Sequence, residues 1–279
     1  MSEFQKIIKY CAMAFAAFLA FSILTGIVTA VLALSGFLSN SPGKGTAEIN
    51  KSFENVKSLS IEHSIGTLNI KQGSSNKVEV EAENVSEDMV IDRSFSGELR
   101  IKSKFSFWNI FDGKSAMGSK SVITLYIPED FLADKVRLDA GAGNIYIEAL
   151  NTEKLDVNAG AGNINGSRIR ADQVKLDGGV GDITFEDAEF TDTDIDSGVG
   201  NVNIQGNLYG KNKIDCGVGN VTLDLLQSPD DYDLTVDKGM GSIHINGEKY
   251  SSLNWNNRQA DNSLDINGGV GNIGINFKE

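Results

Sequence analysis

The feature of this sequence that most restricts its fold is a ten-residue block that recurs seven times in the second half of the chain. Typical copies are LDGGVGDITF from Leu176 and IDSGVGNVNI from Ile195. The first glycine of each G-x-G falls at positions 141, 160, 179, 198, 217, 239 and 269, so the first four steps are all 19 residues long. A fixed period of this kind is the mark of a repeat architecture.

Apolar and polar residues alternate with period two inside each block, which predicts strands and not helices. Two aliphatic columns, which begin at Leu138 and Ile145, are expected to point inward. The residue inside the G-x-G, from Ala142 to Val270, is also apolar in every copy and is likewise expected to point inward. The glycines open backbone conformations that are closed to other residues, and therefore predict a tight corner between two strands.

A unit this short cannot bury its own apolar face, but stacked units bury a continuous core, with adjacent strands about 4.8 Å apart. The predicted fold is therefore all-β: a parallel β-solenoid (β-helix) built from G-x-G repeats of ~19 residues. The polar residues after each G-x-G, from Asn144 to Asn272, are expected to stack in a hydrogen-bonded ladder. The longer steps mark insertions near Gln227–Tyr232 and at Glu248–Ser263, which are expected to form loops on one face.

The sequence before the repeats is strand-like but irregular. LSIEHSIGTLNI, from Leu59 to Ile70, reads as a degenerate block in which Ser64 replaces the first glycine. Because a solenoid needs an atypical end to prevent edge-to-edge growth, this part is predicted to cap the stack. Its most aromatic stretch, Phe105 to Phe111, is either a hairpin tucked over the end of the core or an exposed contact patch.

An uncharged, mainly apolar run near the N-terminus is long enough to cross a bilayer, which takes about 20 residues. It is also longer than the apolar core of a signal peptide, about 7–15 residues, so an uncleaved anchor is favoured over cleavage near Ala33. Lys6 and Lys9 precede the run and place the N-terminus in the cytoplasm. The expected parts are a cytoplasmic N-terminus (1–10), a transmembrane helix (11–38), a linker (39–47), a strand-rich capping part (48–133) and the regular solenoid (134–279).

Composition argues against several kinds of site. The net charge of −13 disfavours nucleic acid as a partner, because binding it depends on Lys and Arg. Two cysteines and two histidines are little material for a disulfide framework, a zinc site or a histidine-based active site. Cys216 reads as a packed small side chain, and His63 and His244 each as a surface or ladder residue.

The aspartates that precede the glycines raise the question of calcium. Calcium-binding β-rolls, however, use a nine-residue G-G-x-G-x-D-x-U-x repeat, so a solvated polar face is the favoured interpretation. Asp192, Asp194 and Asp196 alternate on one strand and could hold a hard cation, but no ligand geometry follows from the spacing. Because the G-x-G leads into a strand and not a helix, it is not a phosphate-binding loop. The sequence therefore predicts no catalytic, cofactor-binding or metal-binding residues, and no cofactor.

The repeated (I/L/V)-D-x-G-x-G-(N/D)-(I/V)-x-(I/L) motif, the single N-terminal anchor and Ile127-Pro128-Glu129 at the end of the front half resemble the bacterial putative-adhesin β-repeat family, a domain of unknown function. The resemblance covers roughly residues 48–279. It implies a β-solenoid ectodomain, a surface or envelope role and no catalytic residues. Some relatives accompany envelope-stress sensing systems.

The favoured function is that of an interaction protein: a single-pass protein of the cell membrane whose extracytoplasmic solenoid has a binding or scaffold (adhesin-like) role and no catalysis. Its expected partners are the membrane, through the anchor, and an unknown protein or envelope polymer. Two alternatives remain open. One is an accessory or sensor protein of a cell-envelope stress-response system. The other is a polysaccharide-acting β-helix enzyme, which would need carboxylates clustered at one level of the solenoid.

Overall fold

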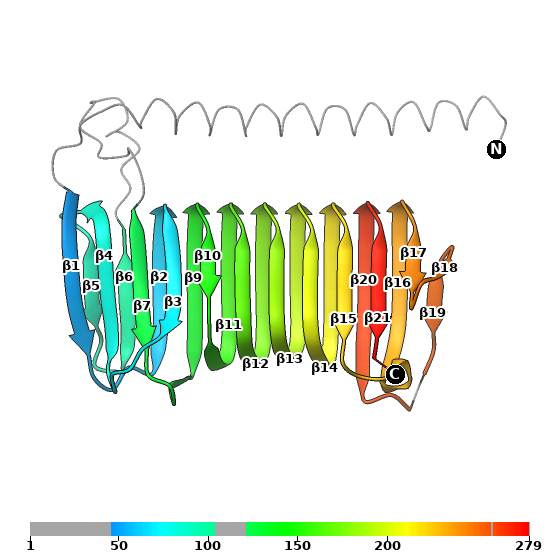
Figure 1. Cartoon of the computed structure of the whole chain (residues 1–279), viewed down its shortest axis with the longest axis horizontal. Coiled ribbons are helices and arrows are strands. Elements are labelled where there is room, and N and C mark those ends of the chain that lie inside the picture. Colours follow the sequence, from blue (N-terminus) through cyan, green and yellow to red (C-terminus); the bar gives the residue numbers. More distant parts are fainter. Residues whose placement is uncertain (1–45, 104–120, 258, 279) are drawn as a thin grey trace, which may run out of the picture. The chain divides into compact units, whose positions relative to one another are not determined.

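A computed structural model describes residues 46–103, 121–257 and 259–278 (Figure 1). The predicted transmembrane helix and the aromatic stretch Phe105–Phe111 lie outside these residues. In the part of the chain that is described, no helix is long and apolar enough to cross a membrane. For this part of the chain the predicted all-β class is confirmed: apart from a 3-10 turn at Pro229–Asp231, its regular elements are strands.

The strands fall into a front group and a repeat group. The front group comprises β1 (Thr46–Phe53), β2 (Ser58–Ile65), β3 (Thr67–Gln72), β4 (Val78–Ser86), β5 (Val90–Arg93), β6 (Glu98–Lys102), β7 (Val122–Ile127) and β8 (Leu132–Ala133). The repeat group comprises β9 (Lys135–Ala142), β10 (Ile145–Ile147), β11 (Leu150–Ala161), β12 (Ile164–Val180), β13 (Ile183–Val199), β14 (Val202–Val218), β15 (Val221–Leu225), β16 (Tyr232–Met240), β17 (Ile243–Ile245), β18 (Glu248–Tyr250), β19 (Leu253–Trp255), β20 (Asn262–Val270) and β21 (Ile273–Phe277).

The repeats stack as parallel rungs, as the sequence predicts. Strands β12, β13 and β14 each run from one G-x-G corner to the next, so that each contributes a full turn of the solenoid. They pair in parallel with a constant offset; Ile164, for example, lies beside Ile183, and Ile183 beside Val202. Figure 1 shows the result as a row of parallel arrows in two layers.

Both predicted aliphatic columns form the core. The side chains at the Leu138 and Ile145 positions are 0–1% exposed in all seven repeats. Their members are Leu138, Val157, Leu176, Ile195, Ile214, Val236 and Ile266 in the first column, and Ile145, Ile164, Ile183, Val202, Val221, Ile243 and Ile273 in the second. Burying this apolar surface rung upon rung is what stabilises the stack, because a single rung has no interior of its own.

The third apolar column, inside the G-x-G, does not point inward, and this expectation was wrong. Val218, Met240 and Val270 are 45%, 49% and 39% exposed. The glycine that follows turns the backbone, so these side chains lie on the outside of a bend and not over the core. The inward position next to the corner belongs instead to the column that contains Ala159 and Cys216, which are 2% and 3% exposed.

The two glycines of each corner meet different requirements. The second glycine has a φ of +141° to +152° in every repeat, a region that other residues rarely adopt. A Cβ there would also lie 1.7–2.1 Å from a carbonyl oxygen of the neighbouring rung. The first glycine has no such φ, but its Cβ would still lie 2.2–2.6 Å from a neighbouring carbonyl oxygen. Both positions therefore need glycine because the neighbouring rung lies so close. Only the second position also needs glycine because its φ is positive.

The predicted polar ladder at the corner is present. Each side chain accepts a hydrogen bond from the backbone N–H of the next rung; Asn163 N donates to Asn144 Oδ1 over 3.0 Å, and Asp182 N to Asn163 Oδ1 over 2.9 Å. The same pattern continues through Asn201, Asn220 and Asn272 to Ser242. These side chains close the corners by bonding groups that the turn leaves without a strand partner.

The order of rungs in space differs from their order in the chain at both ends. The last rung in sequence, β20 and β21, lies between β14–β15 and β16–β17. At the other end, β6 and β7 lie outside β2 and β3, although they follow them in the chain. The degenerate block is itself a rung, since β2 pairs in parallel with β9 and β3 with β10.

Antiparallel strands close both ends of the stack. At the front, β4 pairs with β7 and β1 with β4, while β5 pairs with β6. At the far end, β18 and β19 pair with β17 and β16. The expectation that Glu248–Ser263 forms a loop on one face was therefore wrong, because this insertion contains β18 and β19, which cap the far end of the stack. Such caps protect the parallel edge from further strand addition.

Candidate functional site

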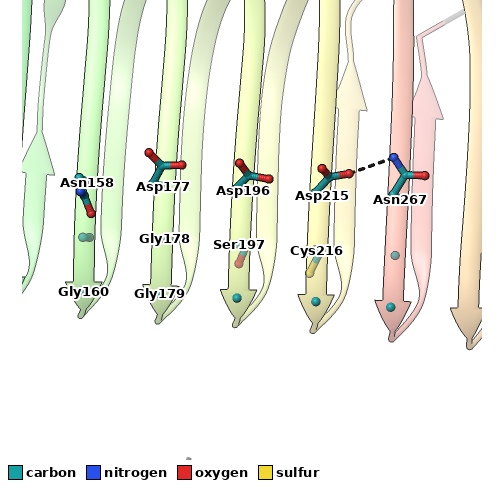
Figure 2. A pocket seen from close by; sticks show the side chains of 15 residues that line it. Asn158, Gly160, Asp177, Gly178, Gly179, Asp196, Ser197, Asp215, Cys216 and Asn267 are labelled. Atoms are coloured by element: carbon teal, nitrogen blue, oxygen red, sulfur yellow. Dashed lines mark hydrogen bonds between the residues drawn. The ribbon is translucent and has the colours of Figure 1, made fainter. Parts of the chain in front are cut away.

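Five polar residues form a ladder along an open groove of about 640 Å³. They are Asn158, Asp177, Asp196, Asp215 and Asn267, contributed in register by β11, β12, β13, β14 and β20. Figure 2 shows their side chains in a row, with the glycines of the corners below them. Each rung contributes one ladder residue, so the groove has the period of the stack.

A second outward column beside this ladder carries charges of alternating sign. In register along the stack it reads Arg137, Asp156, Lys175, Asp194, Lys213 and Asp265. Its cations pair with the ladder two residues further along the same strand: Lys175 Nζ lies 3.1 Å from Asp177 Oδ2, and Lys213 pairs with Asp215. Every second rung thus supplies its own counter-ion, which limits repulsion along the ladder.

Asp196 is the ladder aspartate whose strand offers no such cation, since the residue two positions before it is Asp194. Partial burial, followed by the charges of Asp194 and Asp215, raises the pKa of Asp196. The neighbouring Asp215 differs: the hydrogen bond from Lys213, assisted by one from Asn267 Nδ2 of 2.9 Å, lowers its pKa. Adjacent carboxyl groups in the ladder therefore have pKa shifts of opposite sign.

The structure does not gather the candidate cation ligands into a cage. Within the described residues there is no group of three or more His, Cys, Asp or Glu side chains placed to hold a metal ion. Asp192 lies at a bend with a φ of 48°, and its Oδ1 accepts a hydrogen bond of 2.9 Å from Lys211 N. Asp192 therefore bonds the backbone of the next rung at this bend, whereas Asp194 and Asp196 lie in the two outward columns described above.

Cys216 and the two histidines differ in how far they are buried. Cys216 is buried, as expected of a packed small side chain, and burial raises the pKa of its thiol. His63 stands in register with Ala140 but is only 3% exposed, so it is not a surface residue, and burial lowers its pKa to about 4. His244 is partly exposed, with Nδ1 3.3 Å from Ser242 Oγ.

The residues inside the G-x-G, which the sequence pattern assigns to the core, form a surface. In register along the stack this corner ridge consists of Ile65, Ala142, Ala161, Val180, Val199, Val218, Val270 and Met240. It crosses eight rungs, a length of about 34 Å at the usual strand spacing. Ile65 at one end and Met240 at the other are 38% and 49% exposed. The four members from Ala142 to Val199 are half-buried, so the ridge is a line of apolar side chains that is most exposed toward its two ends. Apolar surface of this kind is typical of interaction sites.

These features define the class of protein: a capped parallel β-solenoid whose outward columns form long, regular surfaces. Residues 56–279 match the sequence pattern of the Toastrack DUF4097 family, and the chain belongs to that family. The expected membership of a β-repeat domain family of unknown function is thereby confirmed.

Several solved structures resemble the chain. A putative cell adhesion protein from Clostridium sporogenes is 19% identical, with a TM-score of 0.38 over 84% of this chain and 100% of its own. A putative adhesin from Bacteroides fragilis is 15% identical, with a TM-score of 0.43 over 84% and 99%. A putative lipid binding protein from Parabacteroides distasonis is 11% identical, with a TM-score of 0.41 over 85% and 98%. No curated protein matches the chain.

Proposed function

We propose that this protein is anchored in the cell membrane by residues 11–38 and displays its solenoid outside the cytoplasm, where it binds an envelope protein or polymer without catalysis. The anchor follows from the length of the apolar run and from Lys6 and Lys9 before it. The acidic solenoid would be repelled by anionic headgroups, which favours a partner other than the membrane's own surface.

The observation that carries the binding role is the corner ridge. A solenoid gains little core burial from aliphatic side chains at a position that is 39–49% exposed in Val218, Val270 and Met240. Alanine, which stands at this position in Ala142 and Ala161, satisfies the same backbone. The larger residues occupy successive rungs, so they offer a partner a continuous line of apolar contact.

The burial and pKa values of Cys216 and His63, and the spacing of the groove carboxylates, favour binding over catalysis. The Cys216 thiol is buried with a raised pKa, so it remains protonated and a poor nucleophile. His63 is buried and is neutral at physiological pH. The groove spreads its carboxylates at one per rung, whereas the alternative of a polysaccharide-acting enzyme needs them clustered at one level.

Co-sedimentation of the purified full-length protein with isolated cell envelopes tests the role. Changing Val218 and Val270 together to Lys places charges on the ridge and should weaken the association by at least about tenfold. Leu132→Lys is the matched control, since Leu132 is an exposed leucine, 66% exposed, that lies off the ridge. Equal association of the ridge variant and the wild type would refute the ridge as the contact surface.

A further inference from the structure

A different outward column runs along the stack, on the strand segments that directly follow the G-x-G corners. It begins at Tyr146 on β10 and continues in register through Asn165, Thr184, Asn203 and Thr222. Asn69 on β3 lies beside Tyr146 on the other side. We refer to Tyr146 and the four residues after it as the amide–hydroxyl column. It is uncharged along its whole length.

The hydrogen-bonding groups of this column are free, in contrast to those of the corner ladder. At the corner, Asn163 and its counterparts accept from the backbone of the next rung. The side chains of Asn165, Thr184, Asn203 and Thr222 make no hydrogen bond to any part of the chain that the structure describes. All four are half-buried, so their donors and acceptors are held in place at rung spacing, about 4.8 Å, and face outward.

The column begins at a shallow cavity of about 390 Å³. Tyr146, Asn69, Asn165 and Thr184 contribute to its lining. Tyr146 is 41% exposed, so an aromatic surface stands between two side-chain amides, with a hydroxyl one rung further on. An aromatic ring with a few convergent polar groups is the usual make-up of a site for a small or extended organic ligand.

We propose that the amide–hydroxyl column binds a neutral polysaccharide, laid along the stack with one sugar ring against Tyr146. A pyranose ring has an apolar C–H face, which packs on an aromatic ring, and hydroxyl groups at its rim, which both donate and accept. Amide and hydroxyl side chains repeated at a constant interval match a polymer whose hydroxyls also repeat. The proposal goes beyond the proposed function, since it adds a second contact surface, distinct from the corner ridge, for an envelope polymer of one chemical class.

The charges beside the column favour a neutral polymer over an acidic one. Two residues after Tyr146, Thr184 and Thr222, the next outward positions hold exposed carboxylates. These are Glu148, Glu186 and Asp224, of which Glu148 is paired with Arg168 at 3.4 Å. The cavity is lined by Glu148 and Glu186 against one cation, Lys71. Carboxylates accept hydrogen bonds from sugar hydroxyls but repel uronate or phosphate groups.

Titration of the full-length protein with neutral hexasaccharides (β-1,4-glucan, β-1,3-glucan and β-1,4-mannan) tests the inference, in a detergent that has no sugar headgroup. At least one should bind, and Tyr146→Ala should raise its dissociation constant by about tenfold or more. Tyr209→Ala should leave it unchanged; Tyr209 is also 41% exposed but lies outside the column. Thr184→Val keeps the shape of the side chain and should also weaken binding, which separates lost contacts from lost folding.

Three results would overturn the inference: no neutral hexasaccharide binds the wild type, the two tyrosine variants weaken binding equally, or a hexamer of galacturonate binds better than the neutral sugars. Envelope co-sedimentation of the same preparations separates this failure from failure of the proposed function. If the wild type still sediments with envelopes and the ridge variant does not, only the glycan inference is wrong. If the wild type binds neither sugars nor envelopes, both proposals are wrong.

Discussion

At the scale of single residues, the glycines show how one repeated motif serves two purposes. Periodicity alone predicts a corner at G-x-G, but it does not say which glycine has the left-handed conformation. In the structure Gly200 has a φ of +146° and Gly198 does not. Both, however, face a carbonyl oxygen of the rung next to them, so a larger residue at either position would push two rungs apart.

Gly200→Ala should therefore lower the melting temperature markedly. The backbone conformation alone costs about 1–3 kcal/mol for a non-glycine residue, and overlap with Gly181 O, 2.0 Å from the ideal Cβ, adds to this. Gly274→Ala is the control: no positive φ is required and the nearest atom, Val221 O, is 4.0 Å away. That variant should melt as the wild type does or slightly higher. Similar losses in both variants would contradict the assigned corner geometry.

The ladder aspartates make a second residue-scale prediction, in which two neighbours respond to pH with opposite sign. The raised pKa of Asp196 means that its ionised form disfavours the fold; its favourable contribution exists below the ordinary carboxyl pKa, about 4, and is lost as the pH rises through the folded value. The lowered pKa of Asp215 means that its contribution exists above the ordinary value and is lost on acidification.

Asp196→Asn should accordingly melt higher than the wild type at pH 7, and Asp215→Asn should melt lower. Both differences should shrink on acidification, that of Asp196 first, because the lowered pKa of Asp215 keeps its carboxylate ionised to a lower pH. Melting curves of the two variants and the wild type at pH 7 and pH 3 test both the signs of the differences and their decrease on acidification. Shifts of the same sign at pH 7 would mean that the ladder behaves as one charged face.

At the scale of elements, most of each rung could be predicted and the order of rungs could not. Period-two alternation identified the strands, and the aliphatic positions at Leu138 and Ile145 identified the core, because burial of one strand face leaves a local trace in the sequence. Which rung lies beside which is a different matter. The columns of β16 and β20 both fit next to β14, and the choice depends on long-range pairing that the pattern does not encode.

A disulfide test distinguishes the observed order from simple stacking in sequence. Thr222 and Gly274 are paired neighbours, with Cα atoms expected about 4.8 Å apart, so Thr222→Cys with Gly274→Cys should form a disulfide on oxidation. Thr222→Cys with His244→Cys should not, since two rung spacings, about 10 Å, separate those positions. Both pairs belong in a background in which Cys11 and Cys216 are replaced by Ser. Cross-linking of the second pair alone would show that the rungs stack in chain order.

At the scale of the whole molecule, the residues of both candidate surfaces recur from repeat to repeat in the sequence, but the pattern does not show which of them are exposed. The corner ridge was assigned to the core because Val218 and its counterparts are apolar; only the bend at the next glycine places them outside. The sequence also contains the pattern of the amide–hydroxyl column, whose residues recur every 19 positions: Tyr146, Asn165, Thr184, Asn203 and Thr222. What the sequence does not contain is the set of hydrogen bonds that leaves this column free and the corner ladder satisfied.

The central claim, that the solenoid binds an envelope component along its corner ridge, is tested most directly by photo-crosslinking in intact cells. A photoreactive phenylalanine analogue at Val218 should give a discrete adduct with a cell-envelope protein or polymer. The same analogue at Asp172, an exposed position off the ridge, should give none. Both variants should be present in equal amounts. Adducts of equal yield from the two positions, or none from Val218, would contradict the account.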